Sequence, residues 1–420
     1  MSVVQPHLEQ EPLLTVEEAQ MIVLETIKPL RTERVGIGSA LGRILAESVA
    51  PRVDLPPHDN SSVDGYAVRA EDTKSQEPCL LKIIEEIPAG KVPQMTVLQG
   101  QAARIMTGAV LPVGADAVVM QENTSLTADS VLIRKAVVTG QNIRYRGEDV
   151  RAGQEVLAAG TALGPGEIGL LASFQKSVIT VTQSPTVAIL STGDEVVDID
   201  EPLLPGKIVN SNSYSLAALV REAGGRPTLL GIVRDTKQEI REAIQEALHA
   251  DFVLSTGGVS VGDYDFVKSV LIELGADMRL WRVLMKPGKP LAFGTVRDTP
   301  YFGLPGNPVS CMVSFLLFVR PALRKAMGYP ATSWHLPIIT AKLSHAIRAG
   351  GDRRHYLRAQ VTYRDGQFWA ATVAGQGSGV LSSMAGTNGL VIVETGVKEL
   401  PEQASAQVVL MRPSFLTAVQ

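Results

Sequence analysis

The 420-residue sequence predicts a multidomain α/β protein with a central, doubly wound and mostly parallel sheet. Between residues 183 and 330, apolar runs of strand length alternate with amphipathic helical patterns, and glycine-rich turns follow the runs. On both sides of this region the hydrophobic period changes to two. That change predicts a β-rich domain inserted near the N-terminus and, in residues 331–420, a barrel or sandwich of antiparallel strands.

The N-terminal third begins with a helix and continues with strands. Thr15-Val16-Glu17-Glu18 is a capping box for a helix that ends near Lys28, before Pro29. Residues 151–181 return to helix and can pair with that first helix to frame the β-rich insertion. The candidate strands of the insertion are residues 66–69, 80–87, 117–121, 130–138 and 141–145.

The central region supplies the clearest elements. Val187-Ala188-Ile189-Leu190 has the composition of a buried strand, and Thr236 caps an amphipathic helix. In open α/β sheets, ligands bind outside the carboxyl ends of the strands, where the glycine-rich turns of this sequence fall. The other predicted elements are strands at 229–233, 251–254 and 291–293 and a helix at 213–222.

Composition limits the class of protein. The hydrophobic fraction of 45%, the charged fraction of 20% and the net charge of −4 are those of an ordinary globular protein, and nothing in them argues for nucleic acid. Cys79 and Cys311 lie far apart without a Cys/His cluster, which indicates a reducing compartment and no structural zinc. No secretory signal and no apolar run of membrane-spanning length is recognised. We therefore expect a cytoplasmic protein without a membrane partner.

The stretch from Asp251 to Phe266 predicts a strand, a turn of small residues and a helix start at Asp263. Converging N–H groups and the helix N-terminus favour an anion. The spacing of Gly257 and Gly262 imitates a P-loop, but acidic residues stand where Lys and Ser/Thr should follow. Carboxylates would repel a phosphate unless a divalent cation, for which Mg²⁺ is the candidate, is bound with it. The simpler interpretation is a structural turn that Asp263 caps.

A second interpretation of the same turn is a nucleophile elbow. Residues 258–262 match G-x-S-x-G, with Ser260 as the nucleophile of an α/β-hydrolase. Such an enzyme also needs an acid and a histidine later in the chain, and His335, His345 and His355 are available.

Acidic and basic side chains recur in the neighbouring turns. Asp194 and Glu195 follow the first central strand, and Lys286 and Lys289 lie in a turn stiffened by Pro287. Acids for a metal beside a lysine pair for an oxyanion are typical of phosphoryl chemistry or anion transfer. Lysines on a turn are more often merely solvated, but the flanking prolines favour the functional interpretation.

Seven motifs occur in order along the chain. They are Asp59-Asn60-Ser61 with Asp64-Gly65-Tyr66, Arg104-Ile105-Met106-Thr107-Gly108, Arg144 with Gly147-Glu148-Asp149, Ser191-Thr192-Gly193-Asp194-Glu195, the segment 255–265, Lys286-Pro287-Gly288-Lys289-Pro290, and the segment 303–310. Together they resemble the molybdopterin molybdenumtransferase family, which includes bacterial MoeA and the E domains of plant and animal homologues. The resemblance extends over almost the whole chain from about residue 13.

The resemblance implies the last step of molybdenum cofactor synthesis. Molybdate is inserted into the dithiolene of adenylylated molybdopterin, which an adenylyltransferase supplies, and AMP is lost with the assistance of Mg²⁺. It also implies a homodimer whose active cleft lies between the α/β domain of one subunit and the β insertion of the other. Because animal relatives anchor membrane receptors, a non-catalytic dimeric scaffold is an alternative. The implied domains are 13–51 with 151–182 (helical and extended, for dimerisation), 52–150 (β-rich), 183–330 (α/β) and 331–420 (β-barrel-like).

The resemblance also assigns roles to residues. The implied catalytic residues are Asp265, Ser260, Glu195 and Asp59, and the implied metal ligands are Asp265, Asp263, Glu195 and Asp194. Lys286 and Lys289 would hold molybdate. The C-terminal family pattern, in which His355 here replaces an acid, implies Arg358 and Ser383 as anion contacts. The other implied substrate contacts are Gly257, Gly258, Asn307 and Ser310, with Thr107, Arg144 and Asp149 on the facing wall from the partner subunit.

Overall fold

The computed structural model describes residues 13–74, 78–258, 266–412 and 417–418. The chain forms two compact units. The first unit comprises Met1–Arg34, Gly42–Ala46 and Thr180–Gln420, and the second comprises Val35–Leu41 and Glu47–Ile179. The chain passes between them in β1 (Thr32–Gly36) and β10 (Val178–Thr182), which pair with each other.

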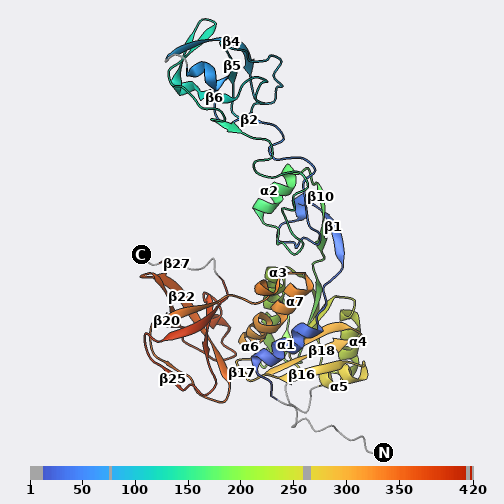
Figure 1. Cartoon of the computed structure of the whole chain (residues 1–420). Coiled ribbons are helices and arrows are strands. Elements are labelled where there is room, and N and C mark those ends of the chain that lie inside the picture. Colours follow the sequence, from blue (N-terminus) through green and yellow to red (C-terminus); the bar gives the residue numbers. More distant parts are fainter. Residues whose placement is uncertain (1–12, 75–77, 259–265, 413–416, 419–420) are drawn as a thin grey trace, which may run out of the picture. The chain divides into compact units, whose positions relative to one another are not determined.

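A six-stranded sheet with the order β14-β11-β15-β19-β18-β16 forms the centre of the first unit (Figure 1). Its strands are β11 (Thr186–Thr192), β14 (Arg226–Val233), β15 (Phe252–Thr256), β16 (Asp277–Arg282), β18 (Pro290–Val296) and β19 (Thr299–Leu304). β14, β11, β15 and β19 run parallel, whereas β18 and β16 run antiparallel to their neighbours. The predicted mostly parallel sheet is confirmed. β16 and β19 were not predicted, because charged residues interrupt β16 and Pro300 and Gly303 interrupt β19.

Helices cover both faces of this sheet, as the doubly wound fold requires (Figure 1). Phe252 and Leu254 of β15 pack into a core that α1, α3, α6 and α7 share, while Val253 packs into a core shared with α4 and α5. Successive side chains of a strand point to opposite faces, so a strand buried on both sides is a continuous apolar run. The helices are α1 (Val16–Thr26), α3 (Ser211–Ala223), α4 (Lys237–Ala247), α5 (Phe266–Glu273), α6 (Pro308–Ser314) and α7 (Arg320–Ala326), with a π-helical segment η5 (Phe315–Val319) joining the last two.

Side-chain caps start the predicted helices. Thr15 Oγ1 accepts a hydrogen bond from the N–H of Glu18 at 3.2 Å, and the Glu18 carboxylate accepts one from the N–H of Thr15 at 2.8 Å. The predicted capping box is therefore present. Thr236 caps α4 by accepting a hydrogen bond from the N–H of Glu239 at 3.3 Å. Each cap satisfies an N–H group that has no partner inside its helix.

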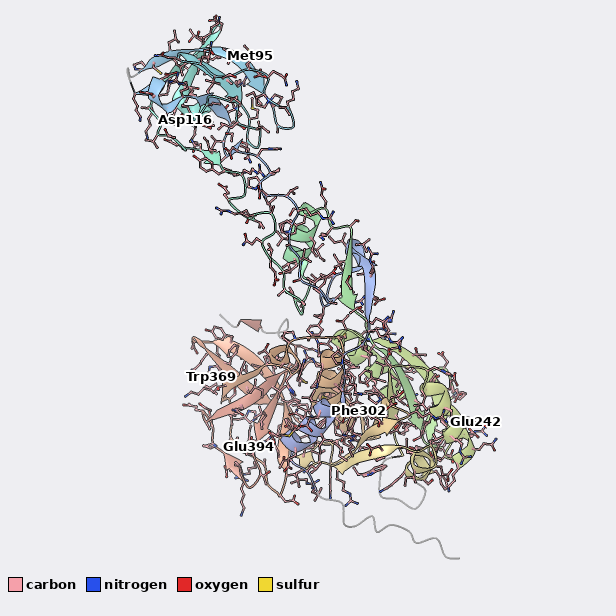
Figure 2. The ribbon with its side chains drawn as sticks, turned by 45° about the vertical axis from the view of Figure 1, so that its right-hand side comes forward. Met95, Asp116, Glu242, Phe302, Trp369 and Glu394 are labelled. Carbon is pink, nitrogen blue, oxygen red and sulfur yellow. The ribbon has the colours of Figure 1, made fainter. Side chains whose placement is uncertain are left out.

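Five C-terminal strands close into a barrel with the ring order β22-β23-β20-β26-β24-β22. They are β20 (Ile338–Leu343), β22 (Arg354–Arg364), β23 (Gln367–Thr372), β24 (Gly389–Val393) and β26 (Ser405–Leu410). Figure 2 labels Trp369 and Glu394 on this barrel. The barrel interpretation is confirmed, but the expectation of purely antiparallel strands is wrong, because β20 and β23 run parallel. The direction of β23 relative to β20 depends on the path of the chain between them, which local sequence patterns do not encode.

β17 (Met285–Lys286) connects the central domain to the barrel. It pairs in parallel with the start of β22, so that Lys286 lies opposite His355. Arg354 reinforces the junction: its Nε donates to Glu394 at 2.8 Å, and its Nη1 forms an ion pair with Glu17 of α1. The backbone of the lysine turn is thereby held against the barrel.

Shorter elements complete the first unit. They are β12 (Val196–Val197), β13 (Ile208–Val209), β21 (Ile347–Arg348), β25 (Glu399–Leu400), β27 (Thr417–Ala418), η6 (Ala331–Ser333) and η7 (Leu381–Ser383).

The second unit contains a six-stranded sheet with the order β6-β3-β5-β4-β8-β7, in which only β4 and β5 run parallel. Asp116, labelled in Figure 2, accepts a hydrogen bond from the N–H of Ala70 at 2.6 Å. The elements are β2 (Asn60–Ser61), β3 (Gly65–Val68), β4 (Cys79–Ile87), β5 (Gln101–Ile105), β6 (Ala117–Met120), β7 (Thr124–Thr127), β8 (Ser130–Ile133), β9 (Ile143–Arg144), α2 (Pro165–Ser173), η2 (Ile37–Ser39), η3 (Ala70–Thr73) and η4 (Gln121–Asn123). In neither unit is any described helix long and apolar enough to cross a membrane.

Candidate active site

The carboxyl ends of β11, β15 and β19 meet in a cluster of turns. Asn212 of α3 ties two of these turns together, because its Nδ2 donates to Thr256 Oγ1 and to the carbonyl of Gly306, each at 2.8 Å. Thr256 Oγ1 donates in turn to the carbonyl of Pro305 at 3.2 Å. Ligands of open α/β sheets bind outside this edge. The turns are therefore fixed where a ligand is expected.

Gly257 and Gly258 leave no room for a side chain, and their φ angles of +89° and +62° favour glycine. A Cβ at Gly257 would lie 2.4 Å from the carbonyl oxygen of Thr192, and one at Gly258 would lie 2.8 Å from Thr192 Oγ1. Thr192 Oγ1 and Asn212 Oδ1 are buried, and neither has a hydrogen-bond partner among the described residues. Such atoms cost free energy unless water or a ligand satisfies them. This edge fits a polar ligand that lies against the glycine backbone.

Acidic side chains gather beside the end of β11. Asp194 and Glu195 follow the strand, and Asp235, which was not predicted, donates its N–H to Asp194 Oδ1 at 3.3 Å. Burial raises the pKa of Asp235, and the charges of Asp194 and Glu195 raise it further. Clustered carboxylates favour a cation, and oxygen ligands suit Mg²⁺. Within the described part of the chain, no group of three His, Cys, Asp or Glu side chains could hold a metal ion.

Three predicted residues, Ser260, Asp263 and Asp265, fall in the segment 259–265 and lie outside the described residues. Their roles, together with the nucleophile-elbow and helix-cap interpretations of that turn, stay predictions. The described chain resumes at Phe266, the first residue of α5.

Asn307 and Ser310 lie at the start of α6. Asn307 is exposed, whereas Ser310 is buried inside the helix. The N–H of Val309 donates to the carbonyl of Ser378 at 3.1 Å. The turn after β19 therefore contacts the glycine-rich loop of the C-terminal region, which also reaches the cavity described below.

Lys286 and Lys289 flank a buried turn. Both lysines are exposed, whereas Pro287 and Gly288 between them are buried. A Cβ at Gly288 would lie 2.8 Å from Ser314 Oγ, so the turn packs closely against α6. The two ammonium groups therefore start from a fixed backbone, which reduces the entropy lost when they bind an anion.

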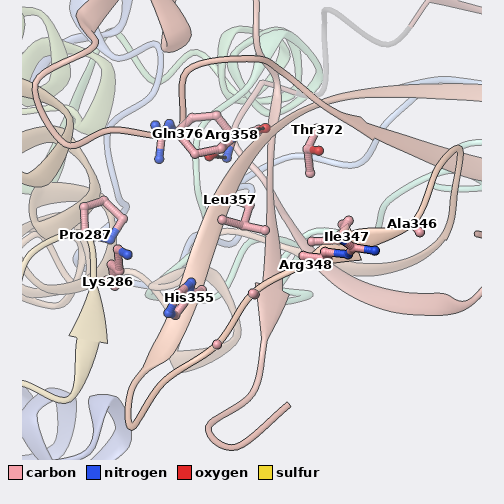
Figure 3. A pocket seen from close by; sticks show the side chains of 12 residues that line it. Lys286, Pro287, Ala346, Ile347, Arg348, His355, Leu357, Arg358, Thr372 and Gln376 are labelled. Carbon is pink, nitrogen blue, oxygen red and sulfur yellow. Dashed lines mark hydrogen bonds between the residues drawn. The ribbon is translucent and has the colours of Figure 1, made fainter. Parts of the chain in front are cut away.

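A cavity of about 300 Å³ lies between the lysine turn and the barrel (Figure 3). Lys286 lines it from β17, Arg348 from β21, and His355 and Arg358 from β22. No carboxylate is among its twelve lining residues. Positive groups that line a cavity without an acid make a site for an anion. Lys289 is not among the lining residues.

Arg358 is the most buried cation of this cavity, with 0% of its surface exposed. Its Nε donates to Ser383 Oγ at 3.1 Å, and its Nη2 donates to the carbonyls of Gly375 at 3.1 Å and Gly377 at 3.0 Å. Because these acceptors are neutral, burial lowers the pKa of Arg358. A bound anion would supply the missing negative charge. Ser383 contacts Arg358 and is not itself part of the cavity lining.

Several residues of the cavity carry no sequence signal. Arg348, Thr372 and Gln376 belong to none of the seven motifs, and the fold of the C-terminal region brings them to one wall. Gln376 is fixed by two hydrogen bonds to the backbone of Arg358, at 3.0 Å and 2.9 Å. His355 stands in the sequence pattern that identified Arg358, but a role in this cavity was not predicted.

The remaining predicted residues, Asp59, Thr107, Arg144 and Asp149, belong to the second unit. There the structure brings their three motifs together. β9, which contains Arg144, pairs with β2, which follows Asp59. Gly108, the neighbour of Thr107, donates its N–H to the carbonyl of Ser61 at 2.8 Å. Asp149 is exposed in the turn after β9.

The fold and the site define a class of protein: it has a doubly wound α/β domain with an edge that fits a polar ligand, a closed barrel, and a β-rich N-terminal region. Three family models match the chain. They are the MoeA N-terminal region (domain I and II) over residues 14–174, the probable molybdopterin binding domain over residues 188–325, and the MoeA C-terminal region (domain IV) over residues 340–411. The chain belongs to the MoeA family of molybdopterin molybdenumtransferases.

Individual relatives are similar to this chain over nearly its full length. The molybdopterin molybdenumtransferase of Nostoc sp. is 41% identical over 92% of this chain and 91% of its own length. The Bacillus subtilis protein of the same name is 36% identical over 96% of each chain. A crystal structure of the molybdopterin biosynthesis MoeA protein from Pyrococcus horikosii superposes with a TM-score of 0.82 at 33% identity, covering 96% of this chain and 100% of that one. These relatives favour neither a serine hydrolase nor a non-catalytic scaffold.

Proposed function

We propose that this chain is a molybdopterin molybdenumtransferase, which inserts molybdate into adenylylated molybdopterin and releases AMP with the assistance of Mg²⁺. One observation carries the proposal: a cavity lined by Lys286, Arg348 and Arg358, without a carboxylate, lies in the same unit as a glycine-rich edge whose buried polar atoms have no hydrogen-bond partner among the described residues. Molybdate is a tetrahedral dianion, and it would provide the negative charge that the cavity lacks.

The proposed roles of the residues follow from their charge. The cavity cations would bind and orient molybdate, because guanidinium and ammonium groups form strong charge-assisted hydrogen bonds with oxyanions. Gly257 and Gly258 would admit the adenylylated pterin against the backbone, and Thr192 Oγ1 would hydrogen-bond to it. Asp194 and Glu195, with Asp263 and Asp265, would hold Mg²⁺. A Mg²⁺ ion held there would supply positive charge to neutralise the pyrophosphate oxygens.

The substrate wall from the second unit is proposed to come from a partner subunit. In a homodimer with the four-domain division given above, Asp59, Thr107, Arg144 and Asp149 of one subunit would face the α/β domain of the other. The protein would act in the cytoplasm, receive its pterin from an adenylyltransferase, and need no nucleic acid or membrane.

Intersubunit complementation tests this arrangement. Asp59→Asn and Asp265→Asn are each expected to lose activity, and mixed dimers of the two variants are expected to regain about one intact site in two. No recovery after subunit exchange, in samples shown by mass spectrometry to contain mixed dimers, would rule out a shared site.

The reaction itself is tested by anaerobic incubation with adenylylated molybdopterin, Mg²⁺ and molybdate, followed by assay of AMP and of the finished cofactor. Lys286→Ala is expected to weaken molybdate binding. Asp265→Asn is expected to retain that binding and to block AMP release. Unchanged turnover in both variants would refute the assignment.

A further inference from the structure

His355 is a cavity residue that the proposed chemistry leaves without a role. It lies on β22 directly opposite Lys286, and Figure 3 shows both side chains on the cavity wall. Only 7% of its surface is exposed. Among the described residues, no group forms a hydrogen bond with its ring nitrogens. A buried imidazole without a partner is free to bind whatever occupies the cavity.

The charges around His355 are predominantly positive. Lys286 faces it from β17, and Arg353 lies in the loop before β22. Burial lowers the pKa of His355, and the charges of these two cations lower it further, which favours the neutral form of the ring. The other cations on the cavity wall are Arg348 of β21 and Arg358 of β22.

Two acids lie in the segments next to His355, and each is paired with an arginine. Asp352 is paired with Arg353 at 3.3 Å, and Glu394, which follows β24, is paired with Arg354 at 2.8 Å. Each carboxylate is therefore engaged by an arginine. No carboxylate lines the cavity, so a negative charge in contact with the imidazole inside it has to come from a ligand.

We propose that His355 is a further oxyanion ligand of the cavity and takes up one proton from solvent as a tetrahedral dianion binds. The inference rests on the proposed function, because it takes molybdate as the dianion. No covalent bond changes: neutral imidazole, a proton and the dianion become imidazolium hydrogen-bonded to the dianion. An opposite charge within about 4–6 Å raises the pKa of such a group by about one to three. Affinity for molybdate therefore falls as the pH rises, by at most about tenfold per pH unit for one proton.

The direct test is NMR of the full chain with ¹³C-labelled histidine, of which the sequence has six. The His355 signal is identified by its loss in His355→Gln or, if that variant does not fold, in His355→Asn. With saturating molybdate, the midpoint of its pH titration is expected to rise by at least one pH unit. The signal of His249, exposed at the end of α4, serves as the control and is expected to stay unchanged. A His355 midpoint that does not move while molybdate binds overturns the inference.

Calorimetry separates this inference from the proposed function. Molybdate binding is measured at pH 7.5 in buffers of different ionisation enthalpy, which gives the number of protons taken up. The unchanged protein and His249→Gln are expected to take up the same fraction of a proton, and His355→Gln is expected to take up almost none. Binding with equal proton uptake in all three proteins overturns only the role of His355. No molybdate binding by the unchanged protein overturns the proposed function and this inference with it.

Discussion

Replacing Arg358 by Met removes the buried charge of the cavity and retains much of the side-chain volume. Arg358 is fully buried, and among the described residues its side chain donates hydrogen bonds only to Ser383 and two carbonyl groups, so no acid would be left unpaired. The substitution relieves the cost of a buried cation but leaves those acceptors without a donor. These effects on folding oppose each other, and anion binding is therefore the decisive measurement.

The expected magnitude follows from the lost contact. A hydrogen bond to a charged group contributes about 1.5–3 kcal/mol. At about 1.4 kcal/mol for each factor of ten, Arg358→Met should weaken molybdate binding by roughly 10-fold to 150-fold. At molybdate equal to 100 times the Kd, the unchanged protein gains about 2.7 kcal/mol of stability, whereas a variant that binds 100-fold more weakly gains only about 0.4 kcal/mol.

Urea unfolding with and without molybdate measures this difference. Arg279→Met is the matched control, because Arg279 lies on β16, outside the cavity, is exposed, and pairs with Asp277 at 3.0 Å. The control is expected to keep the full gain in stability from molybdate. If Arg358→Met also keeps it, the cavity is not the molybdate site.

Three further predictions concern the glycine turn after β15, the pH dependence of stability and the reactivity of the Cys311 thiol. Gly258→Ala should lower the free energy of unfolding by about 2–4 kcal/mol, because alanine in a left-handed backbone conformation and a crowded Cβ both cost free energy. Gly38→Ala is the control, because a Cβ at Gly38 meets open space, and it should change the free energy of unfolding little. Burial raises the pKa of Tyr356 to about 12. In the unfolded chain this tyrosine has a pKa of about 10 and therefore loses its proton first, so stability should fall as pH rises from about 10 to 12. Tyr356→Phe should reduce this loss of stability. Tyr363→Phe should not, because Tyr363 is exposed. Burial also raises the pKa of Cys311 to about 12, so a thiol reagent at pH 8 should modify Cys311 only after unfolding, and rapid modification of the native protein would contradict its buried position.

Local sequence patterns determined much of the first unit. The capping box at Thr15 and the cap at Thr236 start α1 and α4, because a cap depends on residues only three positions apart. The runs that became β11 and β15 are apolar throughout, as strands buried on both faces must be. Since ligands bind where such strands end, the sequence also located the glycine-rich turns beside Thr192.

Only the tertiary structure decided how these strands and turns pair with one another. The parallel pairing of β20 with β23, and of β17 with β22, joins segments far apart in the chain, and no local pattern encodes that register. The pairing of β17 with β22 brings His355 opposite Lys286, and Arg348 of β21 lines the same cavity. Residue type and short spacing predicted an anion site, but only the tertiary structure determined which cations line the cavity. Hydrophobic periodicity specifies which face of an element is buried, and it does not specify which distant element lies against that face.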